Sequence, residues 1–175
     1  MATLTVMTTV DLRTIRLRSG EQFSDVREVE LDPFELGGQR YVPLPERPEA
    51  AFRLTRTSSG LLLELELAAR LVGPCMRCLS DAEITAEIHA REYQATSPGD
   101  ADELSTPYVV DDRLELSAWA RDAVALALPD KILCREVCAG LCPVCGADLN
   151  AEPHVHEDTQ TDARWAKLAE LRDRL

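Results

Sequence analysis

The sequence predicts an α+β protein with a twisted, mostly antiparallel β-sheet, a few helices and a cysteine-rich C-terminal segment. Two central segments alternate apolar and polar residues with the period of two that half-buried strands show. Two later segments have apolar residues at helical spacing. Residues 134–156 hold four of the six cysteines and two of the three histidines. With 175 residues, 45% of them hydrophobic, the chain is long and apolar enough to bury a core.

The N-terminal third is expected to consist of strands and loops. Its first strand is indicated by alternation at Val6, Thr8, Val10 and Leu12. An exposed, extended connection is indicated by three closely spaced prolines, Pro43, Pro45 and Pro48.

Two strands are predicted in the centre of the chain, over residues 61–67 and 83–91. In the first, leucines at odd positions face one way, while Glu64 and Glu66 face the other. In the second, the apolar positions are Ile84, Ala86, Ile88 and Ala90. Gly73 and Pro74 favour a turn between them, which predicts a hairpin with Cys75 and Cys78 near its tip.

The C-terminal half is expected to contain two helices. Trp119, Ala120, Ala123, Val124 and Ala127 share one face of a helix over 117–128, which Pro129 ends. A polar, mobile loop is expected before it, over residues 96–106, and a last helix over 162–175. We therefore divide the chain into a core domain (1–130) with the cysteine hairpin, a metal-binding segment (131–160) and a C-terminal helix (161–175).

The charge of the chain argues against binding to naked nucleic acid. The net charge is -12, and residues 61–117 carry 12 acidic and 4 basic side chains. Affinity for nucleic acid comes largely from basic groups that displace counterions from phosphates. The first residues lack the basic and apolar regions of a signal peptide, and no apolar run is long enough to span a membrane. We expect a cytoplasmic protein without a membrane partner, with its thiols reduced.

The strongest motif is Cys142-Pro-Val-Cys145-Gly. Two cysteines with two residues between them can place both sulfurs on one ion, and the following glycine permits the tight turn. A redox pair has the same spacing, but it needs a strand that leads into a helix, and no such pattern surrounds these residues. We therefore favour zinc.

Eight side chains in total can ligate a metal. His154 and His156 follow the motif, although histidines in an acidic loop are often merely solvated. With Cys142 and Cys145 they would complete one tetrahedral zinc site. A second site would combine the pair Cys75 and Cys78 with the pair Cys134 and Cys138. The alternative is a single zinc on the four cysteines of 134–145. It would leave Cys75 and Cys78 without a metal, as buried thiols. We therefore prefer two zinc ions.

No motif in the sequence indicates catalysis. Both zinc sites, as partitioned, would be full, whereas a catalytic zinc keeps an open position for water. The chain has no nucleophile elbow and no phosphate-binding glycine loop. We therefore expect no catalytic residues. The fold class, with the zinc sites added, is α+β with a C-terminal zinc-binding segment.

Three stretches of the sequence resemble the YceD family of bacterial proteins. Cys75, Arg77, Cys78 and Leu79 match its C-x-R-C-L hairpin, and Glu92-Tyr93 stands where the family has an acidic-aromatic pair. The stretch LALPDKILCREVCAGLCPVCGADLN is similar to the second family signature, and DARWAKLAELRDRL to its terminal helix. The resemblance covers residues 59–175. Many members carry C-x-C in place of His154 and His156, a replacement that preserves metal-binding chemistry.

The resemblance implies a role in the accumulation of large-subunit ribosomal RNA, and hence in ribosome assembly. Because the chain is acidic, we expect it to act without catalysis, through a basic large-subunit ribosomal protein or a pre-ribosomal particle. An RNA-processing nuclease and a zinc or redox sensor are the alternatives. Arg77 is expected either to serve the function or to support the fold by bonding backbone carbonyls.

Overall fold

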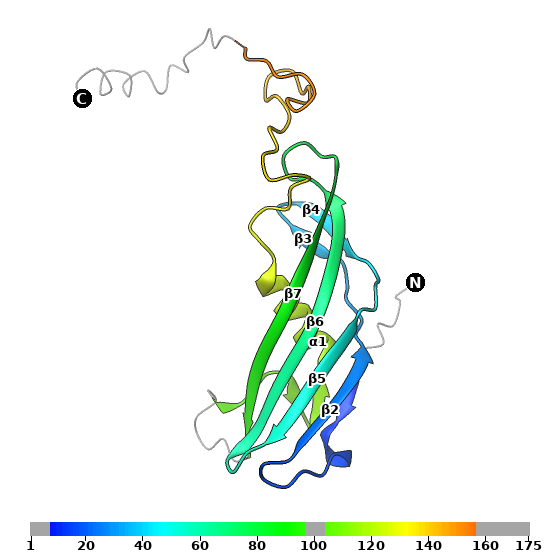
Figure 1. The fold of residues 1–175 in the computed structure, drawn as a ribbon, viewed down its shortest axis with the longest axis vertical. Coiled ribbons are helices and arrows are strands. Elements are labelled where there is room, and N and C mark those ends of the chain that lie inside the picture. The colour runs from blue at the N-terminus through cyan, green and yellow to red at the C-terminus, as the bar shows by residue number, and fades with distance from the viewer. Residues whose placement is uncertain (1–7, 97–103, 157–175) are drawn as a thin grey trace, which may run out of the picture.

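The computed structural model describes residues 8–96 and 104–156, and this part of the chain is built around one long β-hairpin (Figure 1). Strands β6 (Gly60–Pro74) and β7 (Asp81–Ala95) pair antiparallel over their full length. Both contain the strands that the period-two pattern predicts, and the hairpin is confirmed. They extend beyond the predicted bounds because buried residues such as Ala69 and Leu71 continue the same alternation.

Different strands pair with the two halves of β6. Its N-terminal half pairs with β5 (Glu49–Arg56), which pairs in turn with β2 (Gln22–Glu28). Its C-terminal half pairs with β4 (Gln39–Pro43), which continues to β3 (Phe34–Leu36). All these pairings are antiparallel, and they complete a six-stranded sheet in which β7 pairs only with β6.

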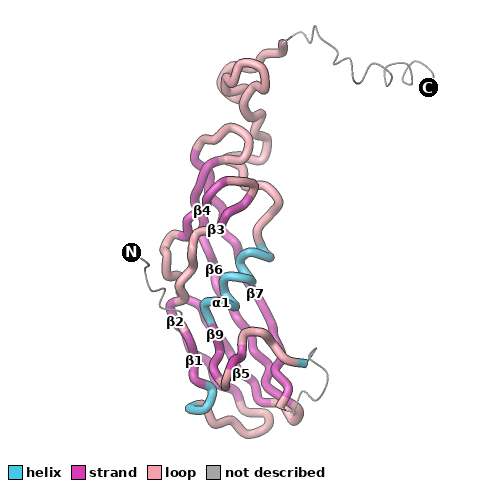
Figure 2. The backbone as a smooth tube through the Cα atoms, turned by 180° about the vertical axis from the view of Figure 1, so that it is seen from behind, coloured by secondary structure: helices cyan, strands magenta, loops and turns pink. Residues whose placement is uncertain are grey.

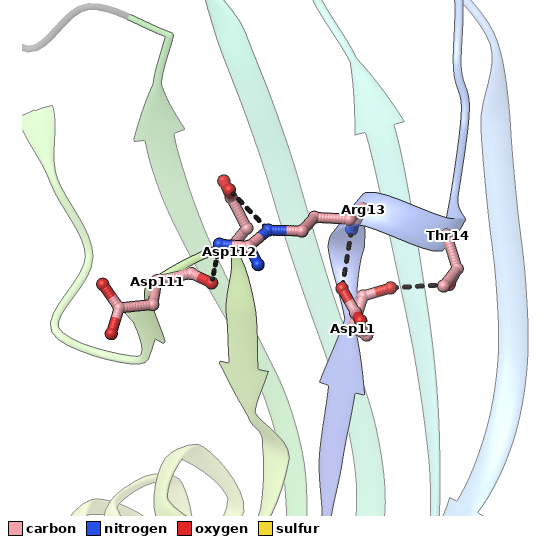
Figure 3. A network of polar contacts seen from close by, with 5 residues as sticks. All are labelled: Asp11, Arg13, Thr14, Asp111 and Asp112. Carbon is pink, nitrogen blue, oxygen red and sulfur yellow. Dashed lines mark hydrogen bonds and ion pairs between the residues drawn. The ribbon is translucent and has the colours of Figure 1, made fainter.

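A second, three-stranded sheet has the order β1–β9–β8. Its strands are β1 (Thr9–Asp11), β8 (Val109–Val110) and β9 (Arg113–Glu115). Asp111 and Asp112 form the two-residue turn between β8 and β9 with φ of 50° and 60°, values that aspartate tolerates well in such turns. Arg13, in the 3-10 helix η1 (Leu12–Thr14), donates to the Asp111 carbonyl and the Asp112 carboxylate, both at 3.1 Å (Figure 3).

Helix α1 (Leu116–Ala127) lies across the inner face of the large sheet (Figure 2). It is the predicted helix, shifted by one residue. Trp119, Ala120 and Val124 are buried in one core with alternate residues of β5, β6 and β7. Within the described residues, no helix is long and apolar enough to cross a membrane. The opposite, outer face of the sheet carries exposed polar residues, Glu66 and Glu87 among them.

Two expectations for the N-terminal third need correction. The exposed connection is confirmed for residues 44–47, but the flanking prolines are buried: Pro43 ends β4, and the Pro48 carbonyl accepts the N–H of Val29 at 3.0 Å. Leu12 belongs to η1 and not to a strand. The predicted terminal helix (162–175), residues 1–7 and residues 97–103 of the expected loop lie outside the described residues.

Candidate metal centres

Four cysteines from two distant segments meet at the tip of the β6–β7 hairpin. The sulfurs of Cys75, Cys78, Cys134 and Cys138 all lie within 4.8 Å of one another. Cys75 Sγ is 3.8 Å from Cys138 Sγ, and Cys78 Sγ is 3.5 Å from Cys134 Sγ. A tetrahedral zinc with bonds of about 2.3 Å places its sulfurs about 3.8 Å apart. The spacing therefore fits one tetrahedral ion.

The hairpin tip is a tight turn that aims backbone groups at the sulfurs. The N–H of Cys75 donates to the Ser80 carbonyl at 2.7 Å, and that of Leu79 donates to the Cys75 carbonyl at 3.0 Å. The turn closes with Leu79 at φ 62°, in the left-handed region. The N–H of Arg77 then points at Cys75 Sγ, 3.4 Å away, and can stabilise a thiolate there.

The hairpin tip also holds the segment that carries Cys134 and Cys138. The N–H of Met76 donates to the Ile132 carbonyl at 3.0 Å. The Arg77 guanidinium donates to the Cys138 carbonyl at 2.7 Å. Of the two roles expected for Arg77, this contact is the fold-supporting one.

The sulfurs of this first cluster differ in acidity. Burial acts to raise the pKa of Cys75, but backbone N–H groups, that of Arg77 foremost, outweigh it and lower this pKa to about 6. Hydrogen bonds from Ser80 favour the Cys78 thiolate, yet burial and the facing sulfurs of segment 134–138 raise its pKa to about 11. Closely spaced thiolates repel one another. A bound dication would offset this repulsion and stabilise the thiolate form of all four cysteines.

The second cluster combines two cysteines with two histidines. The ligating atoms of Cys142, Cys145, His154 and His156 lie within 4.8 Å of one another, and Cys145 Sγ is 3.2 Å from His154 Nε2. His154 Nδ1 lies 2.8 Å from the Glu152 carbonyl, which fits a tautomer with the proton on Nδ1 and leaves Nε2 free to ligate.

The Cys142–Cys145 turn is a compact knuckle. The N–H of Gly146 donates to the Cys142 carbonyl and the N–H of Cys142 donates to the Ala147 carbonyl, both at 2.8 Å. Gly146 has φ +75°, the left-handed conformation for which a glycine was expected at this position. The backbone N–H of Cys145 is the main cause that lowers the pKa of Cys142 to about 6, which favours the ligating thiolate.

The knuckle is attached to the hairpin tip by contacts that the sequence analysis missed. The N–H of Leu141 donates to the Arg77 carbonyl at 3.1 Å. Asn150, which lies between the two ligand pairs of the second cluster, donates its side-chain amide to Cys138 Sγ at 3.5 Å. The Asp148 carboxylate accepts from the backbone and side chain of Asn150. The polar stretch Asp148-Leu149-Asn150 after the knuckle is the sequence feature that could have indicated these contacts.

The eight residues singled out from the sequence thus fall into the two preferred groups of four. Cys134 and Cys138 belong to one group and Cys142 and Cys145 to the other, so these cysteines are not arranged as the alternative single site. Both groups have the donor set and spacing of a closed zinc site. Metal binding itself stays a prediction.

Comparison with known proteins places the chain in a family. The sequence profile described as "Large ribosomal RNA subunit accumulation protein YceD" matches residues 63–172, which include all eight candidate ligands. The chain belongs to the YceD family. In this chain the match runs from β6 through both clusters.

Three mycobacterial relatives extend the similarity. The chain is 34% identical over 169 residues to an uncharacterised protein of Mycobacterium tuberculosis and to one of Mycobacterium bovis, covering 93% of this chain and 80% of each relative. A relative from Mycobacterium leprae is 34% identical over 125 residues, which cover 68% of this chain and 56% of that protein. No solved structure matches the chain. The YceD description links the family to the large ribosomal subunit, without naming a partner or mechanism.

Proposed function

We propose that this chain is a non-enzymatic ribosome-assembly factor, which supports accumulation of large-subunit ribosomal RNA through a basic ribosomal protein. The observation that carries the proposal is the YceD match over residues 63–172, since that family is described by large-subunit RNA accumulation. The geometry of the clusters and the charges on the outer sheet face support the non-catalytic role and the kind of partner.

The clusters support a structural role for zinc. Each supplies four ligating atoms, so a tetrahedral ion would have no open position for water or substrate. Bound at Cys75, Cys78, Cys134 and Cys138, zinc would tie the hairpin tip to the segment after α1. The free energy of metal binding would then add to the free energy of folding.

The outer face of the sheet supports a basic partner. Within the described residues, Glu66, Asp81 and Glu87 form no ion pair and are exposed. Their charge would speed the approach of a basic protein, with an effect that weakens as salt rises. Glu64 differs from them, because it lies between Arg53 and Arg91 at 3.4 and 3.1 Å and its side chain is 19% exposed.

The nuclease alternative is not supported by the described residues. A magnesium-dependent nuclease would be favoured by a cluster of carboxylates. Among residues 8–96 and 104–156, the groups of three or more potential ligands are the two that contain cysteine.

Deletion of the gene in its own bacterium tests this function. We expect large-subunit ribosomal RNA to fall relative to small-subunit RNA, and the wild-type gene to restore it. The double variant Glu66→Lys plus Glu87→Lys should restore it less well, whereas Glu28→Lys plus Glu49→Lys, an equal charge change on the same face, serves as control. Unchanged RNA levels after deletion, or cleavage of ribosomal RNA by the purified protein, would overturn the proposal.

A further inference from the structure

Strand β7 forms a long open edge of the main sheet. It has 15 residues, a length of about 50 Å, and pairs with β6 on one side only. Within the described residues, no backbone hydrogen bond joins β7 to a segment on its other side. Figure 1 shows this edge of β7 beside the C-terminal end of α1, the helix that contacts β7. A long unpaired edge is a template for another strand.

The pairing register identifies the backbone groups that face outward. The Arg70 carbonyl accepts the N–H of Leu44 at 2.8 Å, so the backbone groups of Arg70 point toward β4 and away from β7. Thr85 is directly opposite Arg70. In an antiparallel pair, opposite residues both point inward or both point outward, so the N–H and C=O of Thr85 face the open edge. The other odd-numbered residues of β7, Glu87 among them, share this orientation.

The two faces beside this edge differ in chemistry. On the outer face, β7 presents the exposed residues Asp81 and Glu87, which form no ion pair among the described residues, and Glu83, which is paired with Arg70 of β6. On the inner face it presents apolar side chains, Ile84 and Ala90 being partly buried, and Leu126 in the last turn of α1 is 87% exposed. An added strand would therefore meet carboxylates on one face and apolar side chains on the other.

We propose that the open edge of β7 binds an extended segment of the partner protein by strand addition, with basic and apolar residues alternating in that segment. Its basic side chains lie over Asp81 and Glu87, and its apolar side chains lie on the inner face beside Ile84 and Ala90. Main-chain hydrogen bonds to residues such as Thr85 supply affinity, and the alternation supplies specificity.

A second copy of the chain is the competing occupant of this edge. Antiparallel pairing of two β7 strands about Thr85 places Glu83 opposite Glu87, and like charges directly opposite each other are destabilising. Pairing about Glu87 places the two Glu87 carboxylates opposite each other but also places Glu83 opposite Arg91. Self-association is therefore measured as a separate outcome of the test.

The proposal rests on the proposed function for the identity of the partner, but the edge can be tested separately. The probe is a fluorescent peptide of alternating lysine and valine, with a glutamate-valine peptide of equal length as control, and binding is followed by anisotropy at low salt. Thr85→Pro removes one outward N–H without touching the β6 pairing, while Thr85→Ala keeps that N–H. Glu87→Lys removes a facing charge, and Glu28→Lys makes the same change on β2, about 14 Å away.

We expect the lysine peptide alone to bind, and Thr85→Pro and Glu87→Lys each to weaken binding about tenfold. Thr85→Ala and Glu28→Lys should change it little, and the amide protons of Thr85 and Glu87 should become protected from exchange when peptide binds. Equal binding of both peptides would overturn the inference. So would unchanged peptide affinity in a Thr85→Pro protein whose circular dichroism matches that of the wild type. A dimer of the chain that Thr85→Pro dissociates would also overturn it. Failure here with RNA loss in the deletion strain would reject this interface but not the function.

Discussion

The side-chain amide of Asn150 donates to Cys138 Sγ over 3.5 Å, although Asn150 lies in the loop of the second cluster and Cys138 belongs to the first. The Asn150 oxygen also accepts the N–H of Ala139 at 2.8 Å. One side chain thus positions a candidate ligand of the first cluster and holds the second loop against it. Residues that orient metal ligands affect metal affinity without touching the metal.

We predict that Asn150→Ala lowers the zinc affinity of the first cluster about tenfold, because Cys138 loses both a donor to its sulfur and a fixed neighbouring backbone. Competition with a chromophoric chelator measures this. Val155→Ala is the control, since Val155 lies in the same loop and is 95% exposed. Equal affinities for the two variants would show that Asn150 does not position Cys138.

Gly140 joins the two clusters at a close backbone contact. It has φ +83°, and a Cβ there would lie 3.1 Å from the Arg77 carbonyl oxygen. Gly20 has φ +87° with nothing within 4 Å of such a Cβ. Both alanine variants incur the strain of the left-handed conformation, about 1–2 kcal/mol, but only Gly140→Ala adds crowding. We predict a lower midpoint of thermal unfolding for Gly140→Ala than for Gly20→Ala; the reverse order would contradict the contact.

Loss of the two clusters should affect different parts of the molecule. Cys75 is fully buried at the hairpin tip, whereas Cys145 is exposed in the knuckle. We predict that Cys75→Ser accelerates hydrogen exchange in β6, β7 and the segment after α1. Cys145→Ser should accelerate it only after residue 140. Unchanged exchange in the sheet after complete zinc removal would argue against a stabilising ion at the hairpin.

Tyr108 provides a pH-dependent test of how the β8 segment packs on α1. It stacks on Trp119 with ring centroids 6.1 Å apart and donates to Asp122 at 3.1 Å. Burial, followed by the negative charge of Asp122, raises the pKa of Tyr108 to about 12. The unfolded chain therefore loses this proton first, so the stabilisation present below pH 10 decreases as the pH rises toward 12. Urea unfolding of Tyr108→Phe should show a smaller decrease over that interval; an identical decrease would contradict the packing.

The parts of this fold that depend on local pattern could be predicted from the sequence. Alternation in β6 and β7 arises because one face is buried along the whole hairpin, and the helix over 117–128 shows the spacing of its buried face. The pairing of one edge of β6 with both β5 and β4 has no local signal, because it depends on long-range register. For the same reason the prolines near residue 45 indicated an exposed connection, although Pro43 ends a strand and is buried.

In the candidate site, too, the features that depend on local sequence could be predicted and those that depend on packing could not. Counting ligands was enough to group the eight side chains, because a tetrahedral ion needs four and cysteines occur in closely spaced pairs. The contacts of Arg77 and Asn150 with Cys138 were not predictable, since they depend on how two loops pack. The neutralisation of Glu64 was likewise hidden, because Arg53 and Arg91 come beside it only through the register of β5 and β7.

Metal content, measured together with native mass, tests the central claim that two closed zinc sites hold the C-terminal half of this YceD protein together. Protein purified without added metal should contain two zinc ions per chain. The Cys142→Ser and Cys75→Ser variants should each lose one zinc ion and keep the other. Mild oxidation of the wild-type protein should release no zinc. A single zinc ion that survives both His154→Ala and His156→Ala would contradict the two-site account and favour a local four-cysteine site. Zinc that leaves when the thiols are oxidised and returns when they are reduced would contradict it too, and would favour a sensor.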